Sequence, residues 1–194
     1  MAIRKVAAMG NPILYKIAKP VADPTDPEVA RLAADMQDTL IDIGGSGSAA
    51  PQVFESLRLV VYRFSARLDD NVEELAEPWV TLVNPVLTPV GDEMISGWER
   101  CLSIPGLHGK VPRYKSLSMT YQDLSGAEVT VEASGALAAL LQHECDHLDG
   151  VLYPMQMPDI SKLEFNAEPG HLAQDIADGA KVWPGLRDLV DAWP

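Results

Sequence analysis

The sequence contains few cysteines, few aromatic residues and little positive charge, and these shortages exclude several classes of protein. Only two cysteines, Cys101 and Cys145, occur among 194 residues, too few for the disulfide framework of a small secreted domain. We therefore expect a reducing, cytoplasmic location, where a free thiolate can serve as a metal ligand. The sequence has 15 basic and 28 acidic residues, which give a formal net charge of −13. This balance argues against direct nucleic-acid binding, which needs clustered Lys and Arg.

Long hydrophobic runs are also missing. No apolar stretch approaches the roughly 20 residues of a membrane-spanning helix, so we expect no membrane partner. The opening MAIRKVAAMGNP lacks the apolar core and the cleavage site of a signal peptide. The apolar share of 47% and the charged share of 22% are ordinary for a globular protein. A length of 194 residues suits one domain with an appended tail.

The segment 135–150, GALAALLQHECDHLDG, carries the strongest chemical signal in the chain. Its first half is rich in Ala and Leu and predicts a helix, with Ser134 as an N-cap and Gly150 as a stop. Within it, HECDH matches the H-E-x-x-H pattern. Histidines four positions apart lie on one face of a helix, so His143 and His147 can reach the same metal ion.

The third metal ligand decides the chemistry, and the motif itself does not supply it. Glu144 follows the first histidine, where it can act on a metal-bound water instead of the metal. A catalytic site usually has three protein ligands. Glu164 or Glu168 would give a thermolysin-like endopeptidase, whereas Tyr153 stands where the longer metzincin pattern needs a histidine. Cys101 is the other candidate, although a free cysteine is most often a buried apolar residue.

Patterns along the chain indicate an α+β fold. Asp26 as N-cap and Pro27 at the first position predict a helix, and an apolar stripe continues it to residue 43. We expect a turn at 105–106 and an acidic surface loop over 65–78. Short strands are expected at 3–9, 53–64, 79–87, within 111–133 (two strands) and at 151–158. One N-terminal helix, many short strands and one late helix carrying H-E-x-x-H predict mostly antiparallel strands packed around that late helix.

Three motifs occur in a fixed order: GSGSAAPQ at 45–52, ERCLSIPG at 99–106 and LQHECDHLDG at 141–150. Together they resemble the peptide deformylase family, whose signatures are GxGLAAxQ, EGCLS and QHExDHLxG. The resemblance spans roughly residues 1–157. It implies a catalytic domain over 1–158 and a C-terminal extension of that domain over 159–194, where apolar residues recur at loosely helical spacing.

The resemblance also implies roles for individual residues. The implied metal ligands are Cys101, His143 and His147. The implied catalytic groups are Glu144 as acid and base, and two oxyanion donors, the Gln52 side chain and the backbone N–H of Leu102. The loop implied to line the substrate backbone contains Gly45, Ser46 and Gly47. Glu99 and Arg113 match family positions as well, and we expect a structural ion pair between them.

The implied reaction is the removal of the formyl group from N-formylmethionyl peptides of newly made proteins, with release of formate. The family metal is Fe(II), with Zn, Ni and Co as substitutes. The implied partners are the peptide substrate and, through it, the ribosome; the chain would be a monomer or a homodimer. Two alternatives stay open: a metal endopeptidase using Glu164 or Glu168, and a deformylase-like protein with altered substrate or weak activity that acts mainly by binding.

Two residues depart from the family signatures. Ser48 replaces the leucine of GLAA, and Arg100 replaces the glycine of EGC. Arg100 would either point outward or crowd the cleft. Because the metal ligands and Glu144 are unchanged, we predict an intact metal site with altered substrate preference or efficiency. We expect His108, a few residues further on, to be a surface histidine.

Overall fold

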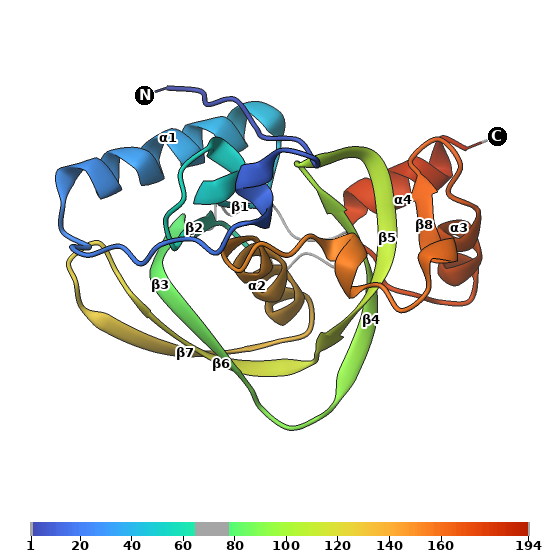
Figure 1. Ribbon diagram of the computed structural model, residues 1–194. Coiled ribbons are helices and arrows are strands. Elements are labelled where there is room, and N and C mark those ends of the chain that lie inside the picture. The colour runs from blue at the N-terminus through green and yellow to red at the C-terminus, as the bar shows by residue number, and fades with distance from the viewer. Residues whose placement is uncertain (1, 65–77, 194) are drawn as a thin grey trace.

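The structure, a computed structural model, describes residues 2–64 and 78–193. The acidic loop expected over 65–78 lies outside these residues, Pro78 excepted. The predicted α+β class is confirmed: two antiparallel sheets enclose a central helix, α2 (Figure 1). Neither cysteine forms a disulfide. Among the described residues, no helix combines the length and apolar character needed to cross a membrane.

Over residues 2–64 and 78–193, the larger sheet has five strands in the order β1-β2-β3-β6-β7, and the smaller sheet has three in the order β4-β5-β8. The strands of the larger sheet are β1 (Gly47–Ala49), β2 (Leu59–Tyr62), β3 (Val80–Pro89), β6 (Ser116–Gln122) and β7 (Glu128–Ser134). Those of the smaller sheet are β4 (Met94–Cys101), β5 (Ile104–Tyr114) and β8 (Leu163–Phe165). The α-helices are α1 (Pro27–Ile43), α2 (Gly135–Leu148), α3 (Gly170–Ala177) and α4 (Pro184–Asp191). Short 3₁₀ turns in the described residues are η1 (Pro12–Tyr15), η2 (Ala50–Val53), η3 (Tyr153–Gln156) and η4 (Ile160–Lys162).

Helix α1 begins as the sequence predicts. The Asp26 side chain accepts a hydrogen bond from the backbone N–H of Glu28, and Pro27 occupies the first helical position. The helix ends at Gly44, which adopts the left-handed conformation with φ 73°. Its apolar stripe packs on β2 and β3; the buried residues of this cluster include Leu32, Met36, Leu40, Leu59, Val61 and Val83.

Helix α2 lies between the two sheets (Figure 1). One face joins the main core, which includes Val60, Leu82, Leu117, Met119, Ala138, Leu141, Cys145 and Leu148. Ser134 occupies the N-cap position but makes no side-chain capping bond. Gly150 follows the helix with φ 73° and lets the chain turn against η1. The other face of α2 turns His143 and His147 toward the end of β4.

Three sequence expectations about strands and turns are wrong. Residues 3–9 form no strand: the N–H of Ala7 bonds Gln52 O and that of Met9 bonds Ser103 O, both at 2.7 Å. The turn between β4 and β5 falls at 102–103, so 105–106 lies within β5. Residues 151–158 contain η3 in place of a strand, because Pro154 suits a first helical turn and cannot donate to a ladder.

Two further strands differ in extent from the strands that the sequence predicts. In the segment 53–64, only β2 (Leu59–Tyr62) is a strand, and Val53 ends the η2 turn. Strand β3 passes Pro85 and continues to Pro89, with a shift in register between Val83 and Val86. Asn84 carries φ 52° at this irregularity, and its side chain exchanges hydrogen bonds with the backbone of Val21.

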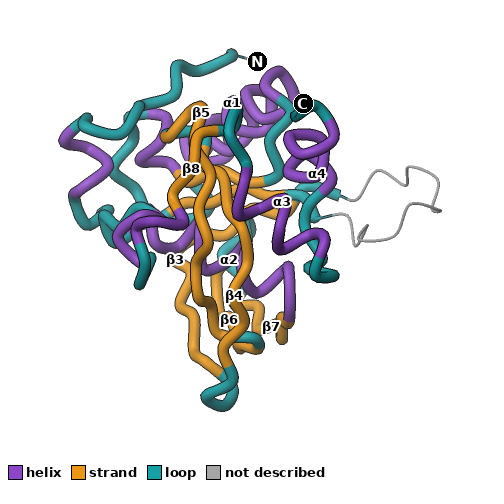
Figure 2. Tube along the Cα trace, turned by 90° about the vertical axis from the view of Figure 1, so that its right-hand side faces the viewer, coloured by secondary structure: helices purple, strands orange, loops and turns teal. Residues whose placement is uncertain are grey.

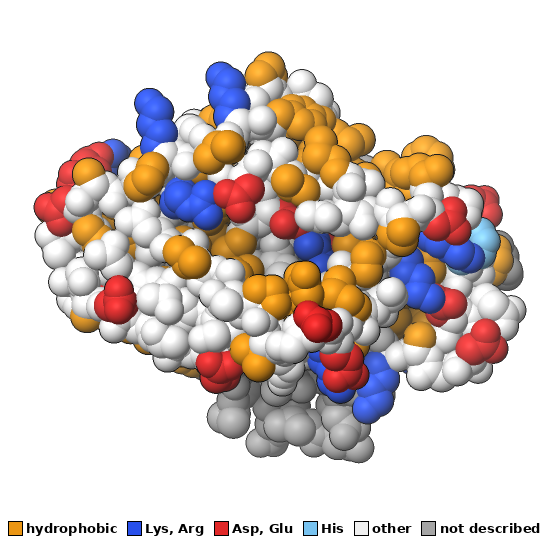
Figure 3. Space-filling model, turned by 60° about the horizontal axis from the view of Figure 1, so that its bottom comes forward, with side chains coloured by type: hydrophobic (Ala, Val, Ile, Leu, Met, Phe, Trp, Pro, Cys, Tyr) orange, Lys and Arg blue, Asp and Glu red, His pale blue; other side chains and the backbone are white. Residues whose placement is uncertain are grey.

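Helices α3 and α4 cover the outer face of the small sheet, the face turned away from α2 (Figure 2). Trp98 of β4 is buried there with Leu172 of α3 and Leu186 of α4. Polar contacts reinforce this packing, since Asp175 accepts hydrogen bonds from Trp98 Nε1 at 2.8 Å and from Lys110 Nζ at 2.5 Å. On the face seen in Figure 3, basic side chains lie interspersed with acidic ones.

We predict that Gly150→Ala destabilises the fold more than Gly179→Ala. Both glycines have positive φ, 73° and 94°, and a side chain in the left-handed region costs about 1–2 kcal/mol. A Cβ at residue 150 would also lie 2.7 Å from the carbonyl carbon of Tyr15, whereas a Cβ at residue 179 meets nothing within 4 Å. Urea unfolding of both variants measures the difference. Equal losses would contradict the proposed close contact.

Candidate metal centre

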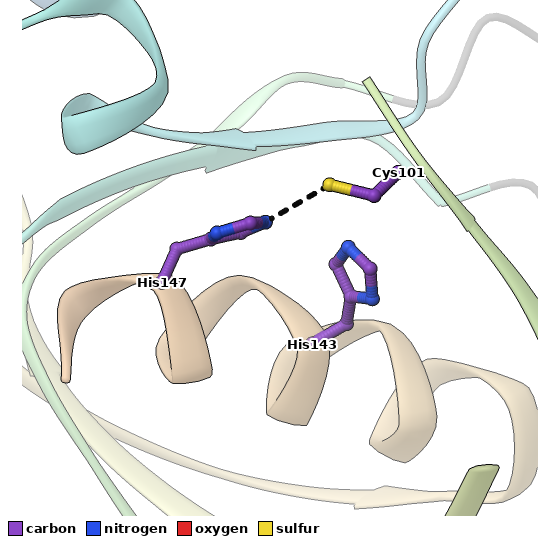
Figure 4. Close-up of side chains that lie close together, drawn as sticks. All are labelled: Cys101, His143 and His147. Atoms are coloured by element: carbon purple, nitrogen blue, oxygen red, sulfur yellow. Dashed lines mark hydrogen bonds between the residues drawn. The ribbon is translucent and has the colours of Figure 1, made fainter. Parts of the chain in front are cut away.

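One thiol and two imidazoles converge at the end of β4 (Figure 4). Cys101, His143 and His147 each offer a ligand atom, and these atoms all lie within 4.8 Å of one another. All three residues are buried, and Cys101 Sγ lies 3.3 Å from His147 Nε2. The two histidines lie on the same face of α2, one turn apart, as their spacing predicts. A thiolate and two imidazoles are a ligand set for a borderline divalent ion such as Zn or Fe(II).

The carboxylate of Glu99, on the same strand as Cys101, orients the imidazole ring of His143. His143 Nδ1 lies 2.7 Å from Glu99 Oε2, and donation from Nδ1 leaves Nε2 with a lone pair for a metal ion. Glu99 in turn accepts hydrogen bonds from Arg113 Nε at 2.7 Å and from Nη2 at 3.0 Å. The expected ion pair between Glu99 and Arg113 is therefore confirmed, and it fixes the carboxylate that holds the imidazole.

Arg113 joins this pair to α2. Its Nη1 donates to Asp146 Oδ2 at 2.6 Å, and the side chain is only 4% exposed. Burial alone would raise the pKa of Glu99, but hydrogen bonds from Arg113 and His143 outweigh it and lower the pKa to about 2. The carboxylate therefore stays charged at neutral pH. One cation balances two acidic groups in a region with little water.

Glu144 lies beside the metal-ligand cluster, on the same helix as the two histidines. It is 4% exposed, and burial raises its pKa to about 7. Its Oε2 atom has no hydrogen-bond partner among the described residues, so a polar group such as a water molecule or a substrate amide fits there. An unpartnered acid with a raised pKa next to candidate ligands is an arrangement suited to proton transfer.

The glycine-rich loop approaches the helix so closely that a side chain has no room. A Cβ added at Gly47 would lie 2.5 Å from Glu144 Oε1, and one at Gly45 would lie 2.5 Å from Leu40 Cδ2 and 3.4 Å from Leu102 Cδ1. Neither glycine has a positive φ, so at both positions it is the close approach of neighbouring side chains that favours glycine. Ser46 between them is exposed. The three predicted loop residues thus lie between Glu144 and the turn that follows Cys101.

Gln52 is held so that its amide group faces the cluster. Its Oε1 accepts a hydrogen bond from the N–H of Ala49 at 2.9 Å, and its Nε2 donates to Ser103 Oγ at 3.2 Å and to Cys101 Sγ at 3.5 Å. Ser103 also donates its backbone N–H to Cys101 Sγ at 3.4 Å. Sequence reasoning missed Ser103, although the residue stands within the ERCLS signature. Leu102, the predicted backbone donor, occupies the same turn.

Glu164 and His108 lie elsewhere, on the outer side of the small sheet. The Glu164 carboxylate is engaged by the ring of His171 at 2.6 Å and by the ring of His108 at 3.2 Å. Within the described part of the chain, Cys101, His143 and His147 form the one group able to hold a metal ion. Neither Glu164 nor the exposed Glu168 belongs to it. The expectation that His108 is a surface residue is wrong: it is fully buried where β8 pairs with β5.

The two departures from the family signatures also have defined places. Arg100 points outward, away from the cluster, because consecutive residues of a strand alternate between its faces. Its guanidinium lies against Gly185 of α4, where an added Cβ would be 2.5 Å from Arg100 Nη2. Ser48 is 4% exposed and pairs with Val61 across β1 and β2. Of the two alternatives for Arg100, the structure shows the outward one.

Comparison with known proteins gives a consistent result. The sequence pattern of the family described as polypeptide deformylase matches residues 3–163. The chain is 43% identical over 180 residues to peptide deformylase 1 of Nitrosomonas europaea, covering 91% of this chain and 99% of that protein. It is 43% identical over 163 residues to peptide deformylase 2 of Ralstonia nicotianae, covering 84% and 92%. The Met-ala-ser bound crystal structure of the class I type b peptide deformylase from Acinetobacter baumannii matches with TM-score 0.71 and 33% identity, over 80% of this chain and 99% of that one.

We predict that Arg113→Met destabilises the fold strongly. Removing the guanidinium leaves Glu99 and Asp146 partly buried without their partner, which typically costs about 3–5 kcal/mol. Arg31→Met is the matched control, because the pair of Arg31 with Glu28 is exposed on both sides and such pairs contribute little. Urea unfolding at neutral pH measures both variants. Similar unfolding midpoints for Arg113→Met and the parent protein would contradict the account.

The low pKa of Glu99 predicts a pH dependence. Its pKa falls from 4.5 to about 2 on folding, so its stabilising contribution is complete above about pH 4.5 and is lost as the pH falls toward 2. The difference in unfolding free energy between the parent protein and Glu99→Gln should therefore shrink as the pH is lowered from 6 to 3. Denaturant titrations at several pH values measure it. A difference in unfolding free energy that stays constant over this range would contradict the lowered pKa of Glu99.

Proposed function

This chain belongs to the polypeptide deformylase family, and on that premise we propose that it hydrolyses the formyl amide of N-formylmethionyl peptides. The products are formate and a peptide with a free amino group. One observation carries the proposal: three buried side chains able to hold one metal ion lie next to an unpartnered buried carboxyl group. Amide hydrolysis needs a nucleophile, a donor for the oxyanion and a proton for the leaving nitrogen. The chain has a candidate for each.

The proposed metal ligands are Cys101, His143 and His147. Fe(II) is the proposed native ion, and Zn, Ni or Co would substitute, because a thiolate with two imidazoles suits ions of borderline softness. When bound, such an ion lowers the pKa of a coordinated water molecule from about 15.7 toward 7. Glu99 contributes by holding the His143 ring through Nδ1, at 2.7 Å. Buried surroundings keep competing water from the thiolate.

Glu144 is the proposed general acid and base. A carboxyl group with a pKa of about 7 can accept a proton and return it near neutral pH. We propose that Glu144 takes a proton from the attacking water and later delivers it to the departing amine nitrogen. Because Gly47 has no side chain, the Glu144 carboxyl group can occupy this position. A Cβ at residue 47 would lie 2.5 Å from Glu144 Oε1. This contact explains why the loop needs glycine at this position.

Gln52 and Leu102 are the proposed oxyanion donors. The Gln52 amide is oriented by the bond from Ala49 N–H to its Oε1, which turns Nε2 toward Cys101 Sγ. From that position Nε2 can donate to the oxygen of a tetrahedral intermediate, together with the backbone N–H of Leu102. Donors fixed in advance lower the barrier because they need no reorganisation during the reaction.

The substrate is proposed to bind as an added strand. In the described part of the chain, β1 and β4 are outer strands of their sheets, and they lie on either side of the candidate metal centre. An extended peptide can pair with such an edge through its backbone. The loop residues Gly45, Ser46 and Gly47 would line the peptide backbone on the β1 side. This placement directs the formyl end of the peptide toward Glu144.

We further propose that residues 1–158 form the catalytic domain and that residues 159–194 extend it over the small sheet. The proposed location is the cytoplasm, in line with two unpaired cysteines. Because the proposed substrates are newly made chains, contact with the ribosome is a proposed association. Either a monomer or a homodimer is compatible with this role.

We predict that Gln52→Leu lowers the rate of formate release from N-formyl-Met-Ala-Ser by about 10²–10³, the usual effect of losing one oxyanion donor. Gln174→Leu, on the surface of α3, is the matched control and should retain the parent rate. Protein reconstituted anaerobically with Fe(II) is the material to assay, with formate quantified directly. Parent-like activity of Gln52→Leu would contradict the donor role.

Glu144→Ala should abolish formate release while the bound metal is retained, because the carboxyl moves protons and is not a proposed ligand. Formate release in the parent protein that disappears in Glu144→Ala supports the proposed reaction. Full metal loading with no release from any formylated peptide would contradict it. That outcome would favour the alternative of a deformylase-like protein that acts mainly by binding.

A further inference from the structure

The outer face of β4 differs in chemistry from the face that carries the metal centre. Glu99 and Cys101 point inward toward α2, as their contacts with His143 and His147 show. The side chains that alternate with them, Trp98 and Arg100, point outward toward α4. Trp98 is buried under α3 and α4, whereas Arg100 is exposed. A cationic side chain thus lies one residue from a proposed metal ligand, on the opposite face of an outer strand.

Arg100 lies beside α4 without a charged partner among the described residues. Its guanidinium lies close to Gly185, where an added Cβ would be 2.5 Å from Nη2. The ion pairs found among the described residues do not include Arg100. It borders a pocket of about 490 Å³. The other residues lining the pocket are Asn166, Ala167, Gly185, Asp188, Leu189, Ala192 and Trp193.

The residues at the start of α4 contact both this pocket and the segment that follows β2. Trp183, immediately before α4, contacts Phe64 edge to face, with ring centroids 5.6 Å apart. Phe64 follows β2 by two residues, and the last residue of β2, Tyr62, pairs with Gly47 of β1. Residues 183–185 therefore contact the β2 side through Trp183 and the β4 side through Gly185. The C-terminal extension connects the two sheets that border the proposed substrate path.

We propose that Arg100 and the first turn of α4 form the subsite for the residue that follows methionine, and that Arg100 makes this subsite prefer an acidic side chain. The proposal rests on the function proposed above. In a peptide that pairs with β4, side chains alternate between the two faces. If the methionine side chain points inward beside the metal centre, the next side chain points outward beside Arg100. Side chains on the same face of neighbouring strands interact directly.

Asp188 is the opposing charge at this subsite. It borders the same pocket from α4 and would weaken the attraction of Arg100 for an acidic side chain. The two residues should therefore act in opposite directions: removing the charge of Arg100 lowers the preference for acid, and removing that of Asp188 raises it. A purely structural role of either residue would change activity on all peptides alike.

The test compares kcat/KM for N-formyl-Met-Glu-Ser, N-formyl-Met-Ala-Ser and N-formyl-Met-Lys-Ser in the Fe(II)-loaded full chain. We expect the Glu peptide to be favoured over the Lys peptide by about fivefold to tenfold, the scale of a favourable against an unfavourable cross-strand charge pair. Arg100→Gln should reduce this ratio to one or below, because Asp188 remains at the pocket, and Asp188→Asn should increase it. Arg187→Gln removes one positive charge from an exposed position on α4 and should leave the ratio unchanged.

The outcomes separate this inference from the proposed function. If all three peptides are hydrolysed through Glu144 but the Glu-to-Lys ratio is equal in the parent and in Arg100→Gln, the subsite proposal is overturned and the deformylase function stands. If Arg187→Gln lowers the ratio as much as Arg100→Gln, general charge attraction explains the preference and the subsite proposal is also overturned. If no formylated peptide is hydrolysed, both proposals fail.

Discussion

The buried guanidinium of Arg113 is the charge on which the candidate metal centre depends. It binds Glu99 through two hydrogen bonds and Asp146 through a third, and thereby joins β4, β5 and α2. Glu99 then fixes the ring of His143, so the geometry of the proposed ligand set follows from this one cation. Two acidic groups at this depth would be strongly destabilising without it. Stability and ligand orientation are therefore provided by the same side chain.

Close packing of backbone segments places the remaining groups. The glycine loop can reach Glu144 only because Gly47 has no side chain. The extended N-terminal segment stabilises both neighbouring loops, since Ala7 and Met9 donate to the carbonyls of Gln52 and Ser103. These single bonds hold the proposed oxyanion donor and the turn after Cys101 at a fixed separation. The proposed oxyanion donors, Gln52 and Leu102, thus lie in short turns that the extended N-terminal segment holds in place, whereas Glu144 lies on helix α2.

Much of the site could be predicted from local sequence, and several of the failures concern contacts between residues far apart in the chain. Helical spacing placed His143 and His147 on one face, and capping residues defined α1. The N-terminal segment was misassigned because an extended segment becomes a strand only when a partner strand is adjacent, which local sequence does not reveal. The burial of His108 depends on its pairing with β8, which lies far away in sequence. The contact of the Ser103 side chain with Gln52, some fifty residues earlier, cannot be read from local sequence.

The central claim is that Cys101 completes the ligand set of a single metal ion, and metal content tests it most directly. The measurement compares the parent chain with Cys101→Ala and Cys145→Ala after anaerobic loading with Co(II) and removal of unbound ion. Cys145 is the matched control, because it is buried in the main core on another face of α2. We predict about one ion per chain, with sulfur-to-cobalt absorption, in the parent and in Cys145→Ala, and loss of both in Cys101→Ala. Full cobalt content and unchanged absorption in Cys101→Ala would contradict the account.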